Sequence, residues 1–181
     1  MARKFSFRPA LTVKGRTFKG LRGYAGKPFH PPLTDVPVSA YVFAAFFDVV
    51  SRLRDEAWQR DAATYLLAVG AVFAALSMLT GWADWHRSSK VGTQARRTIN
   101  AHAVLMIAAS ALVLADLAIR AGDEGPASWG LALLTVAAAA VTTVGATYGG
   151  SLVFDYGFNV ETSGDHPVWH ESEVDVFPGG H

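Results

Sequence analysis

An all-α membrane protein is the fold class that this sequence predicts, with four transmembrane helices in a bundle, an extended arm before it and a tail after it. Of the 181 residues, 51% are apolar and only 17% are charged, well below the quarter that is usual in soluble domains. Two long stretches, 62–82 and 127–154, contain no charged side chain at all. Backbone polar groups in lipid must be satisfied within the chain, so runs of this length indicate spanning helices.

Residues 1–29 predict a basic arm. Half of all Lys and Arg lie there, and no acidic residue occurs before Asp35. On a membrane protein such an arm is typical of the cytoplasmic side and of contacts with anionic lipid or partner subunits, and we do not expect nucleic acid as a partner. The residues expected to bind partners are Arg3, Lys4, Arg8, Lys14, Arg16, Lys19, Arg22 and Lys27.

Residues 30–157 predict the transmembrane domain, with spans at about 36–53, 62–85, 98–119 and 127–154. We expect Pro37 in the first turn of the first span, where a missing N–H costs nothing. The fourth span is rich in Ala, Gly and Thr, and small residues let helices approach closely in lipid. A compact bundle follows.

Residues 158–181 predict an acidic tail, because no Lys or Arg follows Arg120. His166 and His170 in this tail are four apart, the spacing of a metal pair on a helix, but Pro167 separates them. Four spans bring arm and tail to one side, which carries 12 Lys and Arg against 4 on the other. The positive-inside rule then predicts a multi-pass protein of the inner or plasma membrane with both termini in the cytoplasm.

A repeat organises the spans into two helical hairpins. The segments DVVSRLRDE and DLAIRAGDE, which start at Asp48 and Asp116, share their first aspartate, an arginine and a final acidic pair at the same offsets. Each first aspartate precedes an arginine by four positions, which brings both onto one helix face. We therefore expect two structural ion pairs, Asp48 with Arg52 and Asp116 with Arg120, near the outer boundary. A proton relay would need acids deeper in the membrane.

Polar side chains gather at the cytoplasmic ends of the predicted spans, namely His30, Asp84, His86, Asn100 and His102. Histidines ligate haem iron or a metal, and a quinone pocket uses a histidine or an aspartate beside aromatic rings. Histidines at helix ends also serve as hydrogen-bond donors to loop backbone, which leaves a structural role open. The cofactor-binding candidates are His30, His102 and Asp84.

Four segments, HPPLTDVPVSAYVFAAFFD, GWADWH, the histidine of INAHAVL and GGSLVFDYGFNV, together resemble a four-span bacterial membrane family known as a domain of unknown function. Members occur alone or N-terminal to Rieske domains, so the resemblance implies a setting of electron transfer. The family pattern places an asparagine after the third-span histidine, whereas Asn100 precedes His102 here. The positions that match are His30, Pro31, Asp48, Gly81, Asp84, His102, Tyr156 and Gly157.

Taken together, these patterns predict a non-catalytic accessory subunit of a membrane electron-transfer complex of the respiratory type, which docks through its spans, arm and tail. No cofactor is the first expectation. The alternative is a redox-active anchor in which the histidines hold a b-type haem or a quinone.

The chain has no cysteine, so it holds no disulfide and no Rieske cluster. No phosphate loop or nucleophile elbow indicates an enzyme, and a transporter would need a polar path at the midplane.

Overall fold

A computed structural model describes residues 18–23, 27–122 and 124–158. It contains a short 3-10 turn, η1 (Gly20–Arg22), and the helices α1 (His30–Arg54), α2 (Ala57–Ser88), α3 (Gln94–Arg120) and α4 (Trp129–Phe154). All four helices are long and apolar enough to cross a membrane. The prediction of a four-helix, all-α membrane protein is confirmed.

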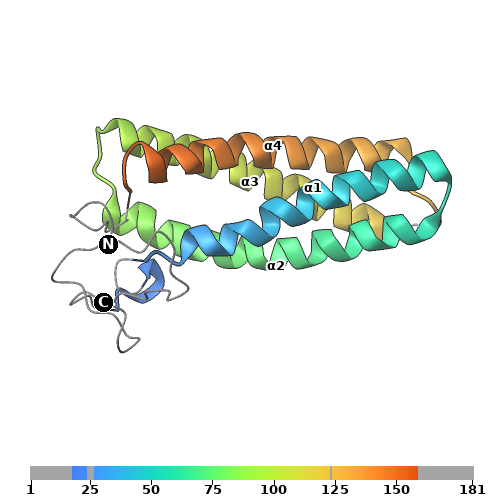
Figure 1. The fold of residues 1–181 in the computed structure, drawn as a ribbon, viewed down its shortest axis with the longest axis horizontal. Helices are drawn as coiled ribbons and strands as arrows, with labels where there is room; N and C mark the ends of the chain where they lie inside the picture. Colours follow the sequence, from blue (N-terminus) through green and yellow to red (C-terminus); the bar gives the residue numbers. More distant parts are fainter. Residues whose placement is uncertain (1–17, 24–26, 123, 159–181) are drawn as a thin grey trace, which may run out of the picture.

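The helices run up and down in alternation and form an elongated bundle (Figure 1). Contacts join α1 to α2, α2 to α3, α3 to α4 and α4 to α1, so α1 and α3 occupy opposite corners of the ring. We call the end where α1 and α3 begin the histidine end, since His30 and His102 lie there. The opposite end, where α1 and α3 finish at Arg54 and Arg120, is the arginine end.

The first helix begins earlier than the sequence predicts, at His30 instead of position 36. Pro31 and Pro32 occupy its first turn, where backbone N–H groups have no partner within the helix. The placement of Pro37 in a first turn is therefore wrong, because it lies inside the helix. There its ring nitrogen has no hydrogen to donate to the carbonyl of the preceding turn.

The other boundaries also differ from the apolar runs. The second helix starts at Ala57 instead of position 62, because the uncharged run leaves out the first turns, which carry Arg60 and Asp61. Thr93 caps α3 by accepting from the Arg96 N–H at 3.2 Å, and Ser128 caps α4 by accepting from the Leu131 N–H at 3.2 Å. These caps satisfy a free N–H in the first turn of α3 and of α4, whereas α2 begins without a side-chain cap.

Small residues dominate the interior of the bundle. Most members of the central cluster are alanine, and Tyr41 and Leu67 are its bulkiest buried side chains. Gly70 on α2 faces Tyr41 so closely that a Cβ built there would lie 2.6 Å from Tyr41 Cε1. Close approach of backbones supplies the packing that holds helices together in lipid.

Candidate functional site

His30 opens α1 and its imidazole lies against α2. Its Nδ1 is 2.8 Å from the main-chain oxygen of Ser77, and its ring covers the backbone of Gly81, where a Cβ would approach Cε1 to 2.8 Å. The glycine therefore leaves the space that the ring occupies.

His102 on α3 repeats this arrangement against α4. Its Nδ1 is 2.8 Å from the main-chain oxygen of Gly145, and a Cβ on Gly149 would come within 3.1 Å of Cε1. Gly81 and Gly149 keep the offset of the sequence repeat, and so do the carbonyls of Ser77 and Gly145. The offset between the two histidines is larger by about one helical turn, which returns to nearly the same helix face.

The two rings meet inside the bundle from its opposite corners. Their centroids are 6.0 Å apart and their planes are close to perpendicular, at 87°. This separation lies within the range of edge-to-face ring contacts. It is also close to the separation of about 6 Å that two imidazoles have when they bind one metal ion from opposite sides, through nitrogens about 2 Å from it.

The hydrogen bonds fix which ring nitrogen carries the proton. A carbonyl oxygen only accepts, so each Nδ1 that bonds to one must donate its hydrogen. In the neutral ring the remaining nitrogen, Nε2, then presents a lone pair. This tautomer, held by a backbone carbonyl, is the one found in metal-ligating histidines.

The other polar residues predicted at this end have separate surroundings. Asp84 is buried on α2, and the charge of Arg22 in η1 acts on it. His86 is exposed and stacks on Trp82, with centroids 5.7 Å apart. Asn100 is exposed and accepts a 2.9 Å hydrogen bond from Trp85 Nε1. Of the histidines, the structure brings only His30 and His102 together among the described residues.

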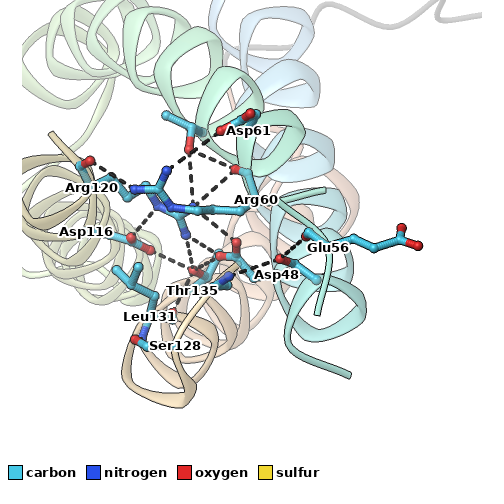
Figure 2. Close-up of polar contacts among 12 residues, drawn as sticks. Asp48, Glu56, Arg60, Asp61, Asp116, Arg120, Ser128, Leu131 and Thr135 are labelled. Atoms are coloured by element: carbon cyan, nitrogen blue, oxygen red, sulfur yellow. Dashed lines mark hydrogen bonds and ion pairs between the residues drawn. The ribbon is translucent and has the colours of Figure 1, made fainter. Parts of the chain in front are cut away.

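A buried ionic network occupies the arginine end (Figure 2). Arg120 Nε lies 2.7 Å from Asp116 Oδ1, at the predicted i, i+4 spacing. The guanidinium also forms an ion pair with both carboxylate oxygens of Asp48 on α1. The hydroxyl of Thr135 on α4 lies 2.6 and 2.7 Å from one oxygen of each aspartate. One arginine thus joins α1, α3 and α4.

Arg52 does not share this role, although the repeat predicts that Asp48 pairs with it. The Asp48 carboxylate is directed to Arg120, and the Arg52 guanidinium lies over the Trp129 ring, 5.4 Å from its centroid. The buried Arg60 supplies a second positive charge nearby and donates to the main-chain oxygen of Arg120 at 3.0 Å. Its ion pair is with Asp61 at 3.7 Å, so Arg120 is the cation that Asp48 and Asp116 share.

Several predicted residues lie outside the described part of the chain, namely Arg3, Lys4, Arg8, Lys14, Arg16, His166 and His170. Of the basic arm, Lys19, Arg22 and Lys27 are described. The first two line a pocket against α2.

Sequence reasoning did not identify the residues that hold the histidines and the buried arginine in place. Every residue has a main-chain oxygen, so the sequence could not indicate that those of Ser77 and Gly145 accept hydrogen bonds from the histidines. Gly81 and Gly149 did have a signal, because they occupy equivalent positions in the sequence repeat. Nothing in the sequence distinguishes Thr135 from the other threonines of the fourth span.

Comparison with known proteins gives one result. Residues 26–162 match a family described as predicted membrane protein, DUF2231. No curated protein and no solved structure matches the chain.

Proposed function

The chain belongs to the DUF2231 family of predicted membrane proteins, and we propose that it is a redox-active membrane subunit in which His30 and His102 would hold the iron of a b-type haem. The observation that carries this proposal is the meeting of two imidazoles from opposite corners, each with Nδ1 bonded to a carbonyl and Nε2 left with a lone pair.

A porphyrin suits this donor set better than a bare metal ion. Among the described residues, no group of three or more His, Cys, Asp or Glu side chains is placed to hold a metal. Protein zinc sites use three or four such ligands. The porphyrin contributes four nitrogens of its own, so two histidines complete the coordination of its iron.

The tautomer favours haem over quinone. A quinone carbonyl oxygen needs a hydrogen-bond donor, whereas a neutral ring whose Nδ1–H is committed to a backbone carbonyl offers only the lone pair of Nε2. Iron takes that lone pair. Asp84, the third cofactor-binding candidate from the sequence, would not bind the haem in this proposal.

The wider setting is an electron-transfer complex of the inner or plasma membrane, of the respiratory type. A bound haem would supply one-electron chemistry, while partner subunits would supply and accept the electrons. In this proposal the histidine end faces the cytoplasm together with both termini, because 12 of the 16 Lys and Arg are then on that side.

A visible absorption spectrum of the purified full-length chain tests the haem proposal. We expect a Soret band that is lost in His30→Ala and in His102→Ala, and kept in the control His86→Ala, which alters an exposed histidine at the same end. In His102→Met the band should persist with a shifted position, because methionine also ligates haem iron. Absence of the band in wild-type protein from haem-replete cells, or its persistence in both alanine variants, would overturn the proposal.

A second candidate is the non-catalytic accessory subunit predicted from the sequence. The observation in its favour is that each histidine ring already has a hydrogen-bonded carbonyl and a glycine surface to rest on, as a structural histidine would. This candidate predicts a colourless chain that co-purifies with partner subunits in mild detergent. Deleting residues 2–26 should then release the partners and leave the bundle in the membrane, and unchanged co-purification would count against it.

A further inference from the structure

A pocket of about 460 Å³ lies between η1 and the last turns of α2, at the histidine end. Its lining includes Lys19, Leu21, Arg22, Trp82, His86 and Arg87. We propose that this pocket binds the phosphate headgroup of an anionic phospholipid, with the acyl chains lying along α2.

The charges of the pocket fit a phosphate. Three of the lining side chains, Lys19, Arg22 and Arg87, are cations. The charge of Arg22 also acts on the buried Asp84. Basic pockets at the cytoplasmic ends of transmembrane helices are suited to anionic headgroups, and each Lys or Arg contributes about 1 kcal/mol of attraction near such a surface.

The apolar part of the lining distinguishes a lipid from a free phosphate. Leu21 and Trp82 are 54% and 61% exposed, which a phosphate ion alone would not cover. From Trp82 a stripe of exposed large side chains continues along α2, at spacings of three and four positions, through Leu79, Leu76, Val72, Val69 and Tyr65. An acyl chain that leaves the pocket would follow this stripe, since residues at these spacings share one helix face.

The position of the pocket also matches a headgroup. Trp82 and Arg87 lie in the last turns of the α2 span, which ends at Arg87. Trp side chains are enriched at the level of lipid headgroups. Cations, an interfacial tryptophan and an apolar stripe therefore meet where a phospholipid changes from headgroup to chain.

Tryptophan quenching by brominated lipids in reconstituted vesicles tests the proposal. We expect stronger quenching of the full-length protein by brominated phosphatidylglycerol than by brominated phosphatidylcholine at equal mole fraction. The difference should shrink in Trp82→Phe, which removes the tryptophan of the pocket. Equal quenching by the two lipids would overturn the proposal.

A matched pair of variants separates the pocket from general attraction to the basic side. In Lys19→Gln/Arg87→Gln the relative association constant for phosphatidylglycerol should fall roughly fivefold for each cation removed. The control Lys90→Gln/Arg97→Gln removes the same charge from exposed positions outside the pocket and should keep the preference. Equal losses in both double variants would contradict the assignment.

A third experiment distinguishes binding of a phospholipid from binding of free phosphate. In detergent, short-chain phosphatidylglycerol should raise the Tm of the wild-type protein more than inorganic phosphate at the same concentration. Equal stabilisation by inorganic phosphate would assign the pocket to free phosphate and overturn the lipid.

Discussion

At the scale of single residues, the role of a charged side chain depends on its position in the bundle more than on the sequence pattern around it. Arg52 and Arg120 occupy equivalent positions in the repeat, yet the first covers a tryptophan and the second is buried between two aspartates. Removing one partner of a buried ion pair leaves an uncompensated charge in a low-dielectric interior. The two arginines should therefore respond very differently to the same substitution.

Arg120→Gln should lower the stability of the folded bundle by about 3–5 kcal/mol, because Asp48 and Asp116 would lose their shared cation. The matched control Arg52→Gln should cost only about 0.5–1 kcal/mol, the loss of a cation–π contact. Thermal unfolding in detergent, followed by circular dichroism, measures both. Similar losses in the two variants would show that the network does not hold the arginine end together.

The turn between α1 and α2 predicts a response to pH. Hydrogen bonds from the Gln59 amide and the Trp58 indole N–H, at 2.7 and 2.9 Å, lower the pKa of the exposed Glu56 carboxyl. Because the pKa is lower in the folded state, the stabilisation is present above the ordinary glutamate pKa and is lost as pH falls through the lowered value. Unfolding curves should show a small decrease in Tm over that acidic window, and Glu56→Gln should remove this component. An identical pH profile in the variant would refute the assignment.

At the scale of the helices, small residues decide how closely the backbones approach. Gly70 receives the Tyr41 ring, Gly81 receives His30, and Gly149 receives His102. The sequence predicted the number, type and approximate length of the helices, because uncharged runs leave few alternatives. It did not predict that Asp48 crosses to Arg120, since that depends on which corner of the bundle each helix face meets.

Gly70→Ala should destabilise the α1–α2 contact by about 1–3 kcal/mol, since its Cβ would lie 2.6 Å from Tyr41 Cε1. The control Gly130→Ala places a Cβ 3.6 Å from Ser128 Oγ, which is ordinary contact, and should gain up to about 1 kcal/mol from helix propensity. Thermal unfolding compares them. A Gly70→Ala protein as stable as the Gly130→Ala protein would contradict the close packing described here.

At the scale of the whole molecule, the up-and-down order of the helices brings the starts of α1 and α3 to one end and their finishes to the other (Figure 1). Topology alone therefore predicted that His30, Asp84, His86, Asn100 and His102 share an end. It did not predict that His30 and His102 are the pair in contact. The two histidines come from α1 and α3, which are diagonal in the bundle, so their rings approach each other through its interior.

The predicted orientation is open to a direct test, because the chain contains no cysteine. Single cysteines introduced as Lys90→Cys in the α2–α3 connection and Glu124→Cys in the α3–α4 connection are at exposed positions. In intact cells a membrane-impermeant thiol reagent should label Glu124→Cys. It should label Lys90→Cys only after the membrane is permeabilised. The reverse pattern would place the histidine end outside.

The most direct measurement of the central claim is the electron paramagnetic resonance spectrum of the oxidised full-length protein, purified from haem-replete cells. Two imidazole ligands give low-spin ferric iron, and the signal also reports the angle between their planes, which is 87° for His30 and His102. We predict a low-spin ferric signal that disappears in His30→Ala and in His102→Ala. A wild-type protein without a ferric haem signal, or a low-spin signal unchanged in both variants, would contradict the account.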